Sequence, residues 1–210
     1  MDLPGHGGSA KDVGSGIPEG FTDATERAVS ALGFERLHLV GHSMGGAIAA
    51  LLALRRPELV STVTLIAAAG LGPEINGTFI NGFVRASRRR EALEVLSLLV
   101  HDPALVSRTM VEDVLRYKRL DGVPAALAAI AEEWFPAGRQ RIFLRDAIAS
   151  LKSPVQIIWG REDRIIPAAH AEALASRLPV HIFEQTGHLP HMEKAGEVNR
   201  LINRLMQNQA

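Results

Sequence analysis

The sequence predicts an α/β fold in which a parallel β-sheet is covered by helices on both faces. Short apolar segments that fit strands alternate along the chain with longer segments of helical periodicity, an order typical of parallel sheets. The predicted strands are continuous apolar runs, as expected of strands buried on both faces. The chain has 210 residues, 47% of them hydrophobic and 22% charged, which fits one globular domain of ordinary composition.

The first third of the chain begins with a loop rich in glycine and proline at residues 2–10. Gly33 and Pro57 each follow a stretch of helical spacing and would stop a helix there. The elements predicted in this part are a helix over 22–32, a strand over 36–40, a helix over 44–55 and a strand over 62–67.

The rest of the chain divides into a helical middle and a mixed final third. Residues 73–135 show only helical patterns, separated by Asp-Pro and Gly-Val-Pro breaks. The helices predicted in this middle part cover residues 89–100, 103–118 and 122–134. The elements predicted after it are a helix over 139–150, a strand over 155–159, a helix over 168–177, a strand over 180–184 and a helix over 192–206.

Composition excludes several classes of function. Lys plus Arg and Asp plus Glu are both 23, so no net charge favours nucleic acid or an anionic membrane as a partner. Cysteine is absent, which excludes disulfides, thiol nucleophiles and cysteine-based zinc sites, and the histidines are too scattered for a metal site. We find no cofactor motif, no apolar run of the ~18 residues that a transmembrane helix needs, and no signal-peptide pattern. A cytoplasmic location is therefore expected.

The loop after the first predicted strand reads GHSMGG over residues 41–46. A G-x-S-x-G pattern between a strand and a helix describes a nucleophile elbow, which holds the Ser43 hydroxyl above the sheet. In such a turn the N–H of Met44 would point at a developing oxyanion, and small residues would be needed at Gly41 and Gly45. A glycine-rich turn with a helix-capping serine is the alternative interpretation.

The loops after the last two predicted strands supply partners for this serine. A serine nucleophile needs a histidine base and an acid that orients it, here expected in the chain order serine, acid, histidine. The loop after the third strand offers Asp163 with Glu162 beside it, and the loop after the fourth offers His188 with His191 close behind. Because ligands bind at the carboxyl ends of parallel strands, we predict a Ser43, His188 and Asp163 triad. The alternatives are that Asp163 is a helix N-terminal or salt-bridging acid and that His188 is an ordinary loop histidine.

Four other features have less specific interpretations. His38 lies within a strand and is expected to be structural, while His42 is expected to pack within the elbow or shape the pocket. His6 fits a turn better than a catalytic role. The arginines at 88–90 fit a solvated helix start better than an anion site.

Several segments carry a resemblance to a known family. DLPGHGGS, GHSMGG, WGREDRIIP and TGHLPHME resemble the α/β-hydrolase family from its fourth strand to its end. AGLGPEING, SRRREALEVL and VEDVLRYKRLDGV resemble more narrowly the hydrolase-fold domain at the C-terminus of the dihydrolipoamide acetyltransferase component of acetoin dehydrogenase complexes. The resemblance implies that Ser43 is the nucleophile, Asp163 the acid and His188 the base, with the Met44 N–H as one oxyanion donor.

The same resemblance implies a division of the chain. Residues 1–72 and 136–210 would form the hydrolase core, and residues 73–135 a helical cap inserted over the active site. The aromatic residues expected to line the pocket or the core beneath this cap are Phe79, Phe83, Tyr117, Trp134 and Phe135.

The chain also departs from the family pattern. The strands that precede the DLPGHG loop in the family are expected to be missing, a deficit of roughly 50–60 residues if one βαβ unit takes ~30. The loop that supplies a second oxyanion N–H would be missing with them, and no substitute is visible in residues 1–35. The strand at 36–40 would then be an apolar sheet edge able to pair with a second chain. No lipoyl domain is visible in these residues.

Three functions are compatible with these observations. The first is a hydrolase that forms an acyl-enzyme from a small ester or thioester substrate. The second is an acyltransferase that passes acetyl from dihydrolipoamide to coenzyme A, so that the acyl group would be bound to a lipoyl group or to coenzyme A. The third is an inactive, truncated remnant of such an enzyme or a binding module, which retains a triad that it cannot use.

Overall fold

The computed structural model describes residues 1–208, within which four strands form one parallel sheet in the order β1-β2-β3-β4. These strands are β1 (Leu37–His42), β2 (Val60–Ile66), β3 (Val155–Gly160) and β4 (Val180–Phe183). Every residue of β2 and β3 is buried, whereas exposure alternates along β1. The predicted α/β class is confirmed. Continuous burial is wrong for β1 and for β4, whose four residues are only partly buried, because these two strands lie at the edges of the described sheet.

The buried strand β2 contains three polar residues, although the strands are predicted as continuous apolar runs. Thr64 Oγ1 accepts a hydrogen bond from the amide of Gln156 at 2.9 Å, and Thr62 Oγ1 lies 2.9 Å from His38 Nδ1. The third, Ser61, accepts one from Arg36 Nε at 3.0 Å. These bonds satisfy the hydroxyls inside the sheet, and His38 has the structural role expected of it.

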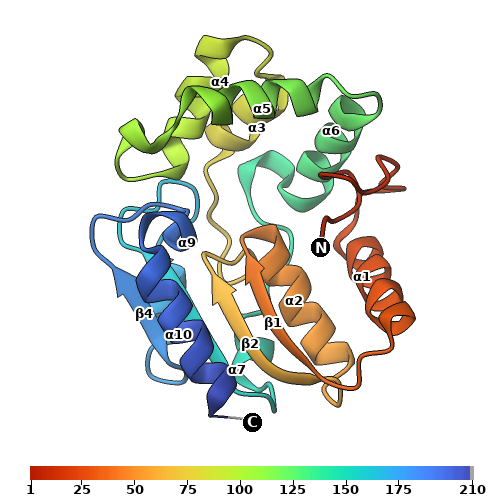
Figure 1. Cartoon of the computed structure of the whole chain (residues 1–210), viewed down its shortest axis with the longest axis vertical. Helices are drawn as coiled ribbons and strands as arrows, with labels where there is room; N and C mark the ends of the chain where they lie inside the picture. Colours follow the sequence, from red (N-terminus) through yellow and green to blue (C-terminus); the bar gives the residue numbers. More distant parts are fainter. Residues whose placement is uncertain (209–210) are drawn as a thin grey trace.

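Helices cover both faces of the sheet (Figure 1). On one face, Val198 of α10 packs with Ile66 and Ile158. On the other, Ile48 of α2 and Ile148 of α7 join a large core that includes Leu65. The helices of these two layers are α1 (Pro18–Leu32), α2 (Met44–Arg55), α7 (Arg145–Ala149), α8 (Ala169–Glu172), α9 (Pro190–Glu193) and α10 (Ala195–Gln207).

A further group of helices lies beyond the carboxyl ends of the strands, at the top of Figure 1. It consists of α3 (Gly77–Arg85), α4 (Arg89–Leu96), α5 (Arg108–Lys118) and α6 (Val123–Trp134). A second apolar cluster, which includes Leu96 and Val111, packs within it. The ends of this group meet where Gln140 N donates to Pro73 O at 3.0 Å. The division into a core and a cap at 73–135 stays a prediction.

The structure corrects several predicted helices. Helix α3 was not predicted, because Gly77 and Gly82 lower its intrinsic propensity; Asn76 begins it by accepting a hydrogen bond from Phe79 N at 3.0 Å. The helix predicted over 139–150 is helical only in α7, and the one over 168–177 is α-helical only in α8. The helix predicted over 192–206 is interrupted at Lys194, which separates α9 from α10.

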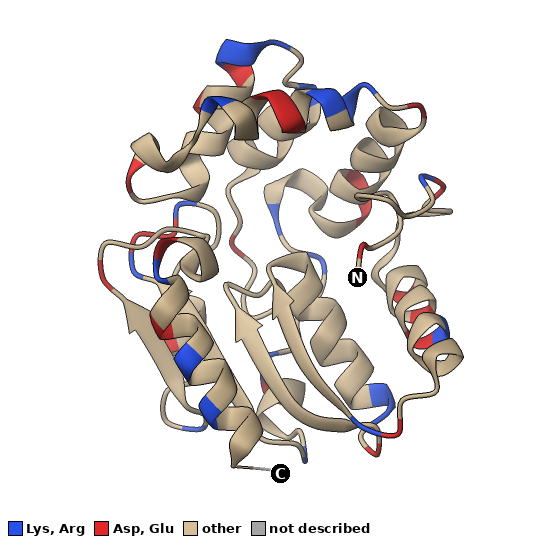
Figure 2. Ribbon diagram, viewed as in Figure 1, with Lys and Arg blue, Asp and Glu red and all other residues tan. Residues whose placement is uncertain are grey.

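Charged residues are distributed without a dominant sign. Figure 2 shows acidic and basic residues on the same helices, both at the top of the molecule and on α10. The arginines at 88–90 precede or begin α4, and Arg90 is 90% exposed beside Glu94. Within residues 1–208, no helix has the length and apolar character needed to cross a membrane.

Candidate active site

Ser43 occupies a strained turn between β1 and α2. Its backbone has φ 52° and ψ −122°, an unusual conformation for a residue with a side chain. Ser43 N donates to Ile66 O at 2.9 Å, and Ser43 O accepts from Ala69 N at 3.0 Å. Backbone bonds to the neighbouring strand β2 and to the segment after it therefore hold the turn in place and fix the serine at the carboxyl end of the sheet.

The steric need for small residues in this turn differs in part from the prediction. A Cβ on Gly41 would overlap the carbonyl oxygen of Gly45, so Gly41 is required as expected. A Cβ on Gly45 would meet no atom within 4 Å, which makes the prediction for that position wrong. The close approach is instead at Gly46, where a Cβ would lie 2.6 Å from the side chain of Ala68.

His188 and Asp163 come together with Ser43 in one chain of hydrogen bonds. His188 Nε2 is 3.0 Å from Ser43 Oγ, and His188 Nδ1 is 2.8 Å from Asp163 Oδ2. The side chain of Asp163 is 0% exposed and that of His188 is 3% exposed. Because a carboxylate can only accept, Nδ1 carries the ring proton and Nε2 is free to accept one from Ser43.

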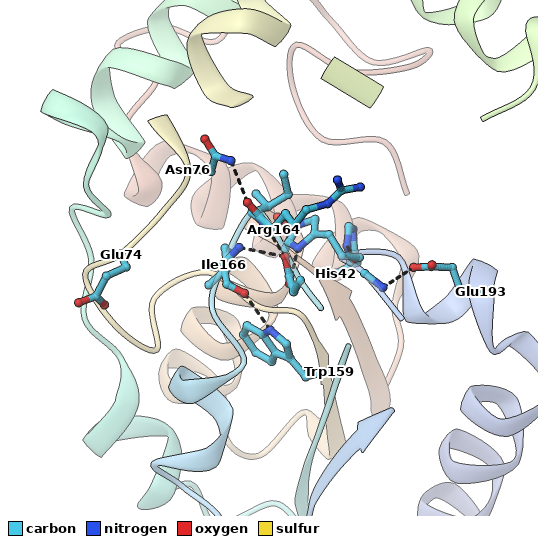
Figure 3. A network of polar contacts seen from close by, with 12 residues as sticks. His42, Glu74, Asn76, Trp159, Arg164, Ile166 and Glu193 are labelled. Atoms are coloured by element: carbon cyan, nitrogen blue, oxygen red, sulfur yellow. Dashed lines mark hydrogen bonds and ion pairs between the residues drawn. The ribbon is translucent and has the colours of Figure 1, made fainter. Parts of the chain in front are cut away.

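The loop after β3 fixes the orientation of the Asp163 carboxylate. Its Oδ1 accepts hydrogen bonds from Ile165 N at 2.8 Å and from Ile166 N at 3.0 Å. Figure 3 shows Trp159 below this loop, where its indole N–H donates to Ile166 O at 3.1 Å. On the other side, Asn76 donates to Arg164 O at 2.8 Å, which ties the loop to the start of α3.

The loop after β4 is fixed by groups that the sequence did not indicate. Glu193 accepts from Gly187 N at 2.8 Å and from His101 N at 2.7 Å. His188 N donates to Leu99 O at 2.7 Å. The carboxylate of Glu193, visible at the edge of Figure 3, thus joins α9 to the segment after α4 and to the loop that carries His188. No motif distinguishes Glu193, since its partners are backbone groups.

His42 links the elbow to the same loop. Its Nε2–H donates to His188 O at 2.8 Å, and its ring lies 4.8 Å from the His188 ring and 4.6 Å from the His191 ring, centre to centre. Burial, with smaller contributions from His188 and His191, holds the pKa of His42 well below its usual value. Burial also lowers the pKa of His191. His42 is therefore held neutral, as a hydrogen-bond donor.

The alternative acid and base have other roles in the structure. Glu162 accepts a hydrogen bond from Thr186 N at 2.9 Å and so joins the two loops. The His191 ring packs against the His42 ring, with the two planes inclined by 58°. Among residues 1–208, no group of three or more His, Asp or Glu side chains is arranged to hold a metal ion.

The remaining predicted residues lie around the serine. Met44 is the first residue of α2, where backbone N–H groups lack helical partners. His6 lines a small cavity that opens at Ser43, while its Nδ1–H donates to Pro4 O at 3.0 Å. Phe79, Phe83 and Phe135 line this cavity too. The other two predicted aromatics do not: Trp134 packs edge-on against Phe21 in the core, and the Tyr117 hydroxyl donates to Gly5 O.

The sequence of the chain is similar to those of known proteins. Residues 1–201 match the model of a family described as the alpha/beta hydrolase family. The dihydrolipoyllysine-residue acetyltransferase component of the acetoin cleaving system of Cupriavidus necator is 42% identical over 97% of this chain and 54% of its own length. That of Pseudomonas putida is 40% identical over 95% of this chain and 53% of its own. The chain thus spans about half the length of the curated relatives it matches.

Solved structures show the same fold. A meta-cleavage product hydrolase from Pseudomonas fluorescens superposes with a TM-score of 0.87 at 24% identity, covering 100% of this chain and 79% of that one. A 2-hydroxy-6-oxo-6-phenylhexa-2,4-dienoate hydrolase from a Rhodococcus species gives a TM-score of 0.82 at 21% identity over 98% of this chain and 78% of its own. At these identities the likeness concerns the fold alone.

Proposed function

The chain belongs to the alpha/beta hydrolase family, and on that premise we propose that it cleaves a small ester or thioester through an acyl-enzyme on Ser43. The observation that carries this proposal is the hydrogen-bond chain from Ser43 through His188 to the buried Asp163, with distances of 3.0 and 2.8 Å. Such a chain gives a serine its base and gives the base a fixed tautomer.

The reaction follows from these contacts. Ser43 Oγ attacks the carbonyl carbon while its proton passes to His188 Nε2. The tetrahedral intermediate then expels the alcohol or thiol, which takes that proton from His188. Water next attacks the acyl-enzyme and gives a proton to His188, which returns it to Ser43 as the acid leaves. Asp163 stabilises the imidazolium form in each half of the cycle.

The backbone N–H of Met44 is the oxyanion donor in this proposal. It stands at the start of α2, where the helix dipole favours negative charge. Loss of one such donor costs about 100–1000-fold in kcat in related chemistry.

A direct test measures turnover of p-nitrophenyl acetate and labelling by a fluorophosphonate. We expect Ser43→Ala to abolish both and His188→Ala to lower turnover steeply. Ser176→Ala is the matched control, because Ser176 is an exposed serine outside the hydrogen-bond chain of Ser43, His188 and Asp163. Equal rates in the wild type and Ser43→Ala, or no labelling of Ser43 in the folded protein, would refute the proposal and favour an inactive remnant.

A second candidate function is acyl transfer from dihydrolipoamide to coenzyme A. It is favoured by the 42% and 40% identity to acetyltransferase components of acetoin cleaving systems. The same serine chemistry would serve, with a thiol in place of water as the acceptor. This function predicts that coenzyme A accelerates loss of acetyl from acetyl-dihydrolipoamide, and an unchanged rate would exclude it. Pairing of β1 edges between two chains stays a prediction, testable by the mass in solution.

A further inference from the structure

The space next to Ser43 is a small apolar cavity, which we call the Ser43 cavity. It has a volume of about 160 Å³, and its walls come from α3, α6 and the segment around Phe135. Phe79 and Phe83 form one side, with ring centres 5.9 Å apart and planes inclined by 29°. Leu127 and Ile130 of α6 form another.

The Ser43 cavity offers no partner for a charge. Among the described residues that line it, none is Asp, Glu, Lys or Arg. His6 is the ionisable side chain of the wall, and its Nδ1–H is already bonded to Pro4 O. Burying a carboxylate there without a partner would be strongly unfavourable.

The volume of the Ser43 cavity limits what can enter. An engineered protein cavity of about 150 Å³ with apolar walls binds benzene, a molecule of six carbon atoms. The Ser43 cavity, at about 160 Å³, has a similar volume. An acetyl group would leave most of it empty, and a chain much longer than six carbons would meet its far wall.

That far wall separates the cavity from a large open groove. The groove, with a volume of about 1010 Å³, is lined by residues of α3, α6 and the segment at 135–138. It shares Ile80, Val84, Ala131 and Phe135 with the Ser43 cavity. These four residues therefore border both the cavity and the groove, and we call this shared wall the partition.

From these observations we propose that the enzyme selects uncharged acyl groups of about four to six carbons or a phenyl ring, and that Ile80 and its neighbours in the partition set the upper size limit. The inference rests on the proposed serine hydrolase function and specifies its substrate class. Acyl groups of this size are larger than the acetyl group of the alternative transferase.

The test is the profile of kcat/KM over p-nitrophenyl esters from acetate to dodecanoate. Each added methylene is expected to raise kcat/KM about fourfold up to hexanoate, the fold-change that corresponds to about 0.8 kcal/mol per buried methylene. The value should then fall for decanoate and dodecanoate. The benzoate ester should be accepted, and the mono-p-nitrophenyl ester of glutarate should react far more slowly than the pentanoate ester of equal chain length.

Two substitutions distinguish the effect of the partition on acyl-chain selectivity from a general effect of an Ile-to-Ala change on folding. Ile80→Ala opens the wall toward the groove, so the optimum should move to octanoate or decanoate. Ile202→Ala makes the same Ile-to-Ala change in α10. Ile202 packs against the cluster of Ile66, Ile158 and Val198, and it does not line the Ser43 cavity. Its profile should match the wild type. An optimum at acetate, or the same profile in Ile80→Ala and Ile202→Ala, would overturn the inference while Ser43-dependent hydrolysis still stood.

A binding measurement keeps the inference testable if no ester is hydrolysed. Methyl hexanoate, methyl acetate and monomethyl glutarate are titrated into the Ser43→Ala protein, with ligand NMR as the readout. Binding of methyl hexanoate above the other two would support the apolar acyl site without turnover. Equal or absent binding of all three would refute it, whatever the fluorophosphonate labelling shows about the function of Ser43.

Discussion

Replacement of Asp163 by Asn tests the orientation of the histidine base with almost no change in shape. Asp163 Oδ1 accepts from Ile165 N and Ile166 N at 2.8 and 3.0 Å, and Oδ2 accepts from His188 Nδ1 at 2.8 Å. The amide oxygen of Asn can keep the two backbone bonds. Its NH₂ group then faces His188 Nδ1, and because two donors cannot pair, the imidazole moves its proton to Nε2.

The expected loss follows from this change of tautomer. With a proton on Nε2, His188 cannot accept the proton of Ser43 from its position 3.0 Å away. The same replacement in a serine protease lowers kcat about 10⁴-fold, which corresponds to about 5.4 kcal/mol in the barrier. Stability should change little in Asp163→Asn. Asp163→Ala should be less stable, because two buried N–H groups lose their acceptor at about 1–3 kcal/mol each.

The assay compares kcat for p-nitrophenyl acetate with urea denaturation for the wild type, Asp163→Asn and Asp163→Ala. Asp163→Asn should lose most of its activity while its urea denaturation midpoint stays nearly unchanged. Activity within tenfold of the wild type in Asp163→Asn would refute the assigned role of Asp163. Equal destabilisation by Asn and Ala would refute the assigned role of its Oδ1 bonds.

Three further predictions concern the surroundings of the site. The pKa of His42 lies below the unfolded value of about 6.5, so the native state binds fewer protons and its stability should fall as pH drops below that value. His42→Asn should therefore make the urea midpoint depend less on pH. The same pH dependence in His42→Asn and the wild type would contradict this. Glu193→Ala removes the acceptor of two backbone N–H groups. The change should lower kcat, and it should lower the free energy of unfolding by about 1–3 kcal/mol for each group left without an acceptor. Full activity would show that the His188 loop does not depend on Glu193. Arg90→Ala breaks an exposed pair with Glu94 and should leave the urea midpoint within error, whereas a clear shift would show that the pair matters.

Local sequence determined the strands, most of the helices and the position of the elbow. The apolar runs locate β2 and β3, and the glycines around Ser43 permit the strained turn between β1 and α2. These features depend on neighbours along the chain, so patterns a few residues long reveal them. Helix α3 was not predicted because its glycines lower its helix propensity, whereas Asn76 and contacts with α6 stabilise it in the fold.

Only the tertiary structure decided which side chains meet. Ser43 and His188 are 145 residues apart in the chain, and their contact depends on the order of the strands. The sequence offered Glu162 beside Asp163 and His191 beside His188. In the fold Asp163 and His188 form the chain to Ser43, whereas Glu162 accepts from Thr186 N and His191 packs against His42. The supporting roles of Glu193 and His42 arise from bonds to backbone groups of distant loops, which carry no residue signature. Sequence therefore fixes the candidates at each strand end, and the close packing of the loops selects among them.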